Sequence, residues 1–245
     1  MLLELLAKIP DTFSFNIGRV FGIPIKIDIS WFVIFLVVLF TVVNLLIADF
    51  PDESKIFLIF VAVIITLVHF AGLLLHELAH SLVAIRKGIK VESITLFVFG
   101  GLALLESQPT RAKDEFQIVI AGPLVTFLLA AIFFLLYSFL AIPIIFTIFE
   151  ILSAFSLVLG IFNLIPVFPS DGGRILRAFL WHKQKDQQKA TINAIKLSKY
   201  ISYSGIFCSV YLAVTGSILA GVQFVLISWF IIEIAKEELK EISKL

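Results

Sequence analysis

Two histidines and a glutamate at short spacing are the residues of this sequence best suited to chemistry. In the segment LLLHELAHSLVAI, His76 and His80 are four residues apart, so a helix would place both imidazoles on one face, where they can bind one metal ion. Glu77 lies between them, and a glutamate at this position takes a proton from a water beside the metal and later delivers it to a leaving amine. Helix packing is the alternative role, but three ionisable groups are costly to bury in an apolar segment. The segment therefore predicts a hydrolytic metal site.

A catalytic zinc ion takes three protein ligands and keeps one position open for water, so a third ligand must come from elsewhere. Cys208 is the single cysteine, which excludes Cys-rich zinc sites and leaves histidine and carboxylate ligands. In the segment NLIPVFPSDGGR, Gly172 and Gly173 follow Asp171 and permit the tight backbone needed to aim a short carboxylate inward. We expect Asp171 to be the third ligand, and a plain turn residue is the alternative.

The composition indicates that these residues belong to a membrane protein. The 245 residues are 60% hydrophobic and 15% charged, which is far more apolar than a soluble domain. Apolar runs long enough for transmembrane helices cover residues 29–48, 56–85, 116–140, 144–165, 200–216 and 219–234. The net charge of +1 gives no indication of a nucleic-acid partner. We predict an all-α polytopic membrane protein of about six transmembrane helices, in one domain over residues 1–245.

The charges of the loops predict the orientation in the membrane. Lys8, Arg19 and Lys26 precede the first apolar segment, whereas the next loop, ADFPDESK, is mostly acidic. Basic residues return in the later loops on the same side, such as Lys87 and Arg111. We therefore expect a multi-pass protein of the cell membrane with both termini in the cytoplasm.

Two segments break the helical pattern and predict a small membrane-associated β element. In GIPIKIDI the isoleucines alternate with other residues, which is typical of a strand and lies in an N-terminal strand region of residues 1–28. The segment KVESITLFVFGGLALLES is rich in β-branched and aromatic residues and predicts a re-entrant hairpin over residues 91–106. Extended backbone at membrane depth needs protein or a water-filled cavity to satisfy its amides, so this hairpin should line a polar interior. As a hypothesis, residues 94–99 offer a strand edge to an unwound substrate.

Four motifs together resemble the site-2 protease family of intramembrane zinc proteases, peptidase family M50. They are HELAH, FGGLALLES, AGPL and NLIPVFPSDGGRILRA, and the match spans most of the chain. The resemblance implies that His76, His80 and Asp171 bind one Zn²⁺ and that Glu77 is the catalytic acid and base. Ser170 departs from the apolar residue that many relatives have before this aspartate. The CBS or PDZ domains of several prokaryotic relatives are not expected here.

The resemblance also implies an activity and contacts with a substrate. The expected enzyme is a zinc metalloendopeptidase that cuts peptide bonds within or near transmembrane segments, in regulated intramembrane proteolysis, so its partners are membrane-protein substrates and the lipid bilayer. Asn163 is expected to contact the substrate or the developing oxyanion, and capping of a kinked helix end is its alternative role. Gly100 and Gly101 are also expected to contact the substrate. His69 either supports the site or packs between helices.

Two other functions stay open at this point. A membrane metal transporter also places histidines and carboxylates inside helices, but it needs ligands open alternately to both sides, and Glu77 as a proton-transfer residue favours hydrolysis. A catalytically idle relative that retains membrane proteins would not require an intact HELAH and Asp171. The sequence gives no indication of the substrate's identity, the mode of regulation or the oligomeric state.

Overall fold

The computed structural model describes residues 14–98, 100–140 and 142–214, together with Val225, Ser228, Trp229, Ile232, Glu233 and Lys236. The chain forms two compact units, which we describe separately. The histidine unit comprises the described parts of Leu6–Gln108 and Ala121–Ile161. The aspartate unit comprises those of Pro109–Ile120 and Phe162–Leu245. The first 13 residues of the predicted N-terminal strand region lie outside the described residues.

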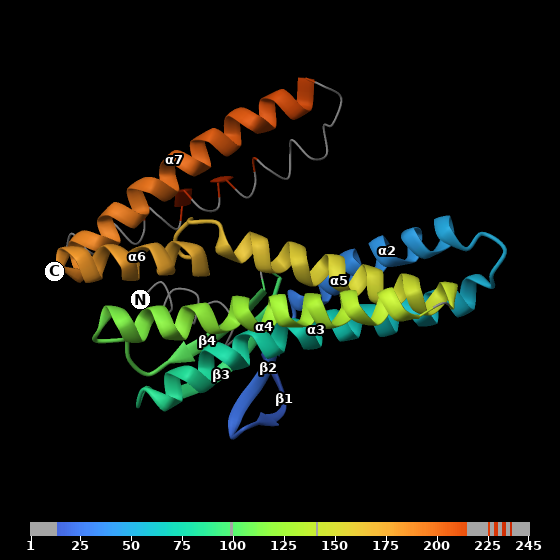
Figure 1. The fold of residues 1–245 in the computed structure, drawn as a ribbon, viewed down its shortest axis with the longest axis horizontal. Coiled ribbons are helices and arrows are strands. Elements are labelled where there is room, and N and C mark those ends of the chain that lie inside the picture. Colours follow the sequence, from blue (N-terminus) through green and yellow to red (C-terminus); the bar gives the residue numbers. More distant parts are fainter. Residues whose placement is uncertain are drawn as a thin grey trace. The chain divides into compact units, whose positions relative to one another are not determined.

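Four helices are long and apolar enough to cross a membrane. They are α2 (Trp31–Asp49), α3 (Lys55–Arg86), α4 (Ala112–Phe139) and α5 (Pro143–Leu164), drawn in Figure 1 from blue to yellow. Large apolar side chains on them are exposed, among them Phe40 at 71% and Phe60 at 62%, as expected of surfaces that face lipid. These helices match the first four predicted spans.

The last two predicted spans differ from what the structure describes. Residues 200–216 were predicted as a separate short span, but most of them belong to a longer helix, α7, that begins at Gln187 and ends at Val214. Its first half carries lysines and polar residues, and α7 is not among the four apolar helices found in the described residues. Most of the predicted span 219–234 lies outside the described residues. A count of six spans therefore stays a prediction.

The helical core of the histidine unit is built by apolar side chains from α2, α3 and α5. Its buried members are Val42, Leu46, Leu58, Val61, Ala62, Ile65, Ile151 and Leu152. On α3 these positions recur at helical spacing, so that one face of the helix is buried for several turns before the histidines. This packing fixes α3 as a rigid support for the residues that follow it.

A four-stranded sheet also belongs to the histidine unit, and its strands follow one another in chain order. They are β1 (Ser14–Val20), β2 (Ile23–Asp28), β3 (Val91–Phe97) and β4 (Gly100–Leu105). The pairs β1/β2 and β3/β4 are antiparallel, whereas β2 and β3 run parallel. The strand expected in GIPIKIDI is present as β2, because its alternating isoleucines put Ile23 and Ile25 into a core with Leu78 of α3 and Ile94 of β3.

The position of β3 corrects the expected location of the free strand edge. Residues 94–99 were expected to offer an edge to the substrate, but β3 pairs with β2 through Ile25 and Ile94 and with β4 through Ile94 and Ala103. Both sides of β3 are therefore occupied. Among the described strands, the outer edge beyond β3 belongs to β4.

The aspartate unit contains the start of α4, the end of α5, α6 (Asp171–Gln184) and α7, and α6 packs against α7. The loop before α6 is held by its own polar groups. The amide of Phe168 donates to Oγ of Ser198 on α7 at 2.6 Å. Ser170 is the N-cap of α6, and its hydroxyl donates to the Ile165 carbonyl oxygen at 2.8 Å and accepts from the Gly173 amide. The serine that departs from the family pattern therefore has a capping role.

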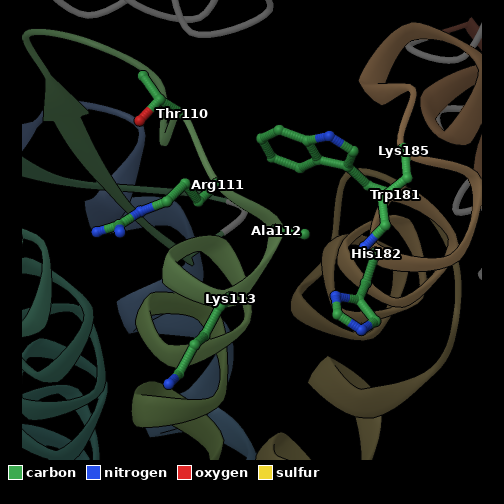
Figure 2. A pocket seen from close by; sticks show the side chains of 7 residues that line it. All are labelled: Thr110, Arg111, Ala112, Lys113, Trp181, His182 and Lys185. Atoms are coloured by element: carbon green, nitrogen blue, oxygen red, sulfur yellow. The ribbon is translucent and has the colours of Figure 1, made fainter.

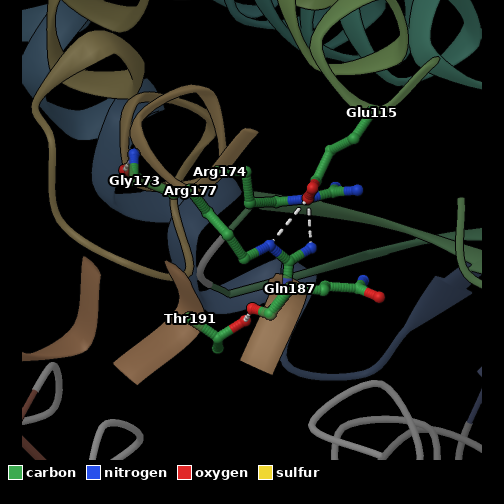
Figure 3. A network of polar contacts seen from close by, with 7 residues as sticks. Glu115, Gly173, Arg174, Arg177, Gln187 and Thr191 are labelled. Atoms are coloured by element: carbon green, nitrogen blue, oxygen red, sulfur yellow. Dashed lines mark hydrogen bonds and ion pairs between the residues drawn. The ribbon is translucent and has the colours of Figure 1, made fainter. Parts of the chain in front are cut away.

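A buried ion pair connects the start of α4 to α6 (Figure 3). Oε1 of Glu115 accepts from Nε of Arg177 at 2.8 Å and from Nη2 of the same guanidinium, and Arg174 lies 3.8 Å away. Glu115 is 0% exposed, and its second oxygen has no hydrogen-bond partner among the described residues. The Arg177 guanidinium also lies over the Phe168 ring. This network anchors the helix that begins with Asp171.

Candidate metal centre

Helix α3 brings the two predicted histidine ligands together. His76 and His80 are one turn apart and are only 2% and 8% exposed. Their Nε2 atoms lie 3.0 Å from each other, and the two rings stand nearly perpendicular with centroids 4.7 Å apart. Both imidazoles therefore direct the same ring nitrogen at one point.

The other nitrogen of His76 has a partner on α4. Its Nδ1 lies 2.8 Å from Oγ1 of Thr126, which is 1% exposed. Metal-binding histidines usually have their second ring nitrogen held by a neighbour in this way, because the contact fixes the ring's orientation. The ring of His76 is thus fixed at one nitrogen and directed at His80 with the other.

Gly122, one turn before Thr126 on α4, gives both rings the space they occupy. A Cβ atom at this position would lie 2.6 Å from Nε2 of His76 and closer still to the ring of His80. Real Cβ atoms essentially never approach that closely, and neither ring can move without leaving its partner. Any side chain at position 122 would therefore collide with the pair of imidazoles.

Glu77 lies on α3 against the edge strand β4. A Cβ atom at Gly101 would lie 2.7 Å from Cδ of Glu77 and 2.8 Å from its Oε1. The backbone of β4 can approach the carboxyl group this closely only because position 101 has no side chain. The structure therefore brings together Glu77 and Gly101, whereas Gly100 opens β4 with a φ of +131°, which L side chains rarely adopt.

The geometry of the histidine pair suits a zinc ion. Two nitrogen ligands of tetrahedral zinc, each at about 2.0–2.1 Å from the metal, are separated by roughly 3.3 Å. The separation of 3.0 Å between the two Nε2 atoms is close to this value. Burial, ring orientation and the contact at Nδ1 of His76 agree with the same chemistry, so the residues present fit a metal ion.

Asp171 and Asn163 lie in the aspartate unit. Asp171 is the first residue of α6 and is partly buried, and Ser170 caps the helix in front of it. Asn163 lies one residue before the end of α5 and is also partly buried. Neither glycine after Asp171 has room for a side chain: a Cβ at Gly172 would overlap the backbone of Leu164 and Ile165, and one at Gly173 the backbone of Val167 and Phe168.

His69 packs among aromatic rings. Its ring lies edge-on to Phe70 at 5.5 Å and to Phe155 at 5.1 Å between centroids. Of the two roles considered for this histidine, these contacts favour packing between α3 and α5.

Two hollows lie in the aspartate unit. One, of about 290 Å³, lies between the start of α4 and the end of α6 and is lined by Thr110, Arg111, Ala112, Lys113, Trp181, His182 and Lys185. In Figure 2 Arg111 and Lys113 extend away from the α6 side chains, and Arg111 pairs with Asp114 at 2.7 Å. The other, of about 630 Å³, is mostly apolar, and Phe116, Leu176 and Phe179 line it beside Gly172. The labelled polar side chains around the first hollow do not point toward a common centre. The second hollow suits an apolar group.

Gly122 and Thr126 are the functional candidates that reasoning from the sequence missed. The motif AGPL belongs to the family resemblance, but the sequence alone indicates no role for its glycine. Thr126 gave no signal at all, since a threonine in an apolar helix usually bonds its own backbone. Pairing of α4 with the histidines is visible only in the folded chain.

Comparisons with known proteins agree with this site. The model of "Peptidase family M50" matches residues 59–144 and 140–208, which include the histidines, α4 and Asp171. The protein Rip3 of Mycobacterium tuberculosis is 39% identical over 177 residues, covering 71% of this chain and 45% of Rip3. "Zinc metalloprotease MJ0392" of Methanocaldococcus jannaschii is 38% identical over 195 residues, covering 78% of this chain and 52% of that protein.

A solved structure has a similar fold. The "Site-2 Protease from Methanocaldococcus jannaschii" superimposes with a TM-score of 0.59 and 32% sequence identity, covering 92% of this chain and 95% of that chain. The curated relatives are longer, and the chain spans about half of their length, 45% of Rip3 and 52% of MJ0392. The residues that match the family model include both HELAH and Asp171.

Proposed function

Because the chain belongs to peptidase family M50, we propose that it is an intramembrane zinc metalloprotease that hydrolyses peptide bonds within or near transmembrane segments of other proteins. The observation that carries the proposal is the buried pair of imidazoles, with Nε2 atoms 3.0 Å apart and Glu77 next to His76 in the same helix. A histidine pair alone would serve storage or transport equally well. A carboxyl group beside it adds the proton transfer that hydrolysis needs.

His76, His80 and Asp171 supply two imidazoles and one carboxylate, a donor set that could hold a metal ion. Relatives of this chain are named zinc metalloproteases, which makes zinc the metal of the proposal. With Asp171 as third ligand, the chain would supply the three protein ligands that a catalytic zinc takes. Its place at the capped start of α6 supports this role, because the network of Glu115 and Arg177 keeps that helix in position.

Zinc, when bound, supplies a Lewis acid that polarises the substrate carbonyl and acidifies a water molecule. Glu77 would accept a proton from a water whose oxygen adds to the carbonyl carbon, and would then donate that proton to the nitrogen as the C–N bond breaks. One water is thereby added across one peptide bond. Gly101 positions the Glu77 carboxyl group by leaving room for it against β4.

A substrate for this site must be locally extended, because the peptide bonds of a helix are covered by the helix itself. The outer edge of β4 suits such a strand by β-strand addition. Gly100 and Gly101 on β4 and Asn163 on α5 remain our candidates for contacts with the substrate. The apolar cavity beside Gly172 suits a large apolar side chain.

The lipid bilayer is the proposed environment, and transmembrane proteins are the proposed substrates. Four apolar helices with exposed large side chains support a multi-pass membrane protein. The charges of the loops support a location in the cell membrane with both termini in the cytoplasm.

Metal analysis and substrate cleavage test the proposal together. Purified protein in detergent is expected to hold one zinc ion per chain, and His76→Gln and Asp171→Asn are expected to lose most of it. Removal of zinc with a chelator should abolish cleavage of single-span membrane substrates, and added zinc should restore it. If folded His76→Gln protein held as much zinc as the original chain, the metal site proposed here would be wrong.

A further inference from the structure

Thr126 makes two hydrogen bonds through one hydroxyl group, and the two bonds constrain each other. Oγ1 lies 2.8 Å from Nδ1 of His76 and 3.2 Å from the carbonyl oxygen of Gly122, one turn earlier on α4. The side chain is 1% exposed, so bulk water does not compete for either contact. The hydroxyl has a single proton to share between the two neighbours.

A carbonyl oxygen can only accept a hydrogen bond, so the bond to Gly122 uses the hydroxyl proton of Thr126. Oγ1 then faces His76 with a lone pair and can only accept there. It follows that Nδ1 of His76 carries the ring proton. In a neutral imidazole with its proton on Nδ1, the free lone pair lies on Nε2, the atom that points toward His80.

We propose that Thr126 is a positioning residue that selects the Nδ1–H tautomer of His76 and thereby presents Nε2 as a metal ligand. The inference rests on the proposed function, in which His76 binds zinc. In metal-free protein, Nε2 of His80 can donate to Nε2 of His76 across the 3.0 Å between them, and a metal ion takes the place of that proton. Thr126 itself touches neither metal nor substrate in this scheme.

The opposite arrangement gives a distinct chemical result. If Thr126 donated its proton to Nδ1 of His76, the bond to Gly122 would be lost and the ring proton would lie on Nε2. A protonated Nε2 has no lone pair for a metal, so the ring that must change tautomer before a metal binds would be His76, which Thr126 holds at Nδ1, and not His80. The two arrangements therefore differ in whether the ring proton of His76 lies on Nδ1 or on Nε2.

Three variants distinguish the effect of the Thr126 hydroxyl group from effects of side-chain size and of losing any buried hydroxyl group. Thr126→Val replaces the hydroxyl by a methyl group of similar size, and Thr126→Ser keeps the hydroxyl. Thr66→Val is the matched control, because Thr66 is 0% exposed on α3 and its hydroxyl donates to the carbonyl oxygen of Ala62 at 2.8 Å, again four residues earlier. Thermal unfolding in detergent verifies that each variant is folded.

The first measurement is the ¹⁵N spectrum of metal-free protein labelled at histidine, with the His76 signals identified by their loss in His76→Gln. We expect Nδ1–H in the original chain, in Thr126→Ser and in Thr66→Val, and a shift toward Nε2–H in Thr126→Val. Nε2–H in the metal-free original chain would overturn the inference, and this result does not depend on whether Thr126→Val folds.

The second measurement is the affinity for Zn²⁺, determined by competition with a chelator. We expect Thr126→Val to lower it by about 10- to 100-fold, the usual effect of losing a group that orients a ligand. Thr126→Ser and Thr66→Val should stay within about threefold of the original chain, well below the smallest loss expected for Thr126→Val. Unchanged affinity in Thr126→Val, together with lost affinity in His76→Gln, would reject only the role of Thr126. Unchanged affinity in His76→Gln would reject the metal site itself.

Discussion

At the scale of single residues, the site depends on the side chains of His76, Glu77 and His80 and on the space that Gly122 leaves by having no side chain. His76, Glu77 and His80 could be predicted because their spacing on a helix has a direct chemical meaning. Gly122 could not, because the space it leaves is used by rings from another helix, 46 and 42 positions away in the sequence. The local sequence pattern identifies the side chains that can bind a metal. The folded chain is needed to identify Gly122, which leaves the space that lets the two imidazoles lie together.

Replacing Gly122 by alanine should weaken zinc binding. The added Cβ would collide with the imidazoles of His76 and His80, so we expect the affinity for Zn²⁺ to fall by about 10- to 100-fold, as when ligand orientation is lost. Chelator competition measures the effect. Gly72→Ala is the control, since its Cβ would meet Cδ1 of Leu129 at an ordinary 3.5 Å and should leave zinc binding unchanged. Full zinc affinity in Gly122→Ala would mean that the rings do not occupy this space.

At the scale of elements, strands could be predicted from alternation and residue type, whereas their neighbours in the sheet could not. The alternating isoleucines of β2 and the β-branched run of β3 identify both segments as strands. Parallel pairing of β2 with β3 joins segments separated by two helices, and no local pattern encodes it. This pairing places β3 between two neighbours, so the outer strands of the described sheet are β1 and β4 and the outer strand next to β3 is β4.

Strand addition at β4 predicts that an amide of this strand matters for cleavage. Amide directions alternate along a strand, and the amide of Glu106 donates to the Lys90 carbonyl on the β3 side, so the amide of Ala103 points to the free edge. Ala103→Pro removes it, and we expect cleavage to fall at least about tenfold, the effect of roughly 1.4 kcal/mol. Ala103→Val keeps the amide and controls for size. Normal cleavage by folded Ala103→Pro protein would reject strand addition at this edge.

The buried pair of Glu115 and Arg177 predicts an asymmetric effect on stability. Removing Arg177 leaves the buried Glu115 carboxylate with only the longer contact to Arg174, so Arg177→Met should lower the free energy of unfolding by about 3 kcal/mol, the low end for a broken buried pair. The double variant Glu115→Leu with Arg177→Met should recover much of this loss, because no unpaired charge remains. Thermal unfolding in detergent measures both effects. Arg111→Met is the control: the Arg111 side chain is largely exposed, so its ion pair with Asp114 should contribute little to stability. Equal stability of all variants would show that the pair does not anchor α6.

At the scale of the whole molecule, hydropathy located the four apolar helices because a membrane-spanning helix needs a long run of apolar residues. It placed α7 less well. Lys196 and Lys199 interrupt the apolar pattern just before residue 200, yet the helix continues through them from Gln187. A helix with a polar first half needs no break where its composition changes, so composition alone misplaced its start.

The predicted orientation can be tested by labelling single cysteines with a membrane-impermeant thiol reagent. In a Cys208→Ser background, Asp52→Cys lies in the turn between α2 and α3, and Lys87→Cys follows the end of α3. With the N-terminus in the cytoplasm, intact cells should label position 52 strongly and position 87 only after the membrane is opened. The reverse pattern would invert the orientation.

The central claim is that Glu77 transfers the proton for hydrolysis at a zinc ion held by its neighbours. The direct test compares the original chain with Glu77→Gln, measuring zinc content and the cleavage of single-span membrane substrates in the same purified samples. We expect both proteins to hold one zinc ion per chain, and Glu77→Gln to cleave at least about 100-fold more slowly, the low end of what a general base contributes. Cleavage at the original rate by zinc-loaded Glu77→Gln protein would contradict the account.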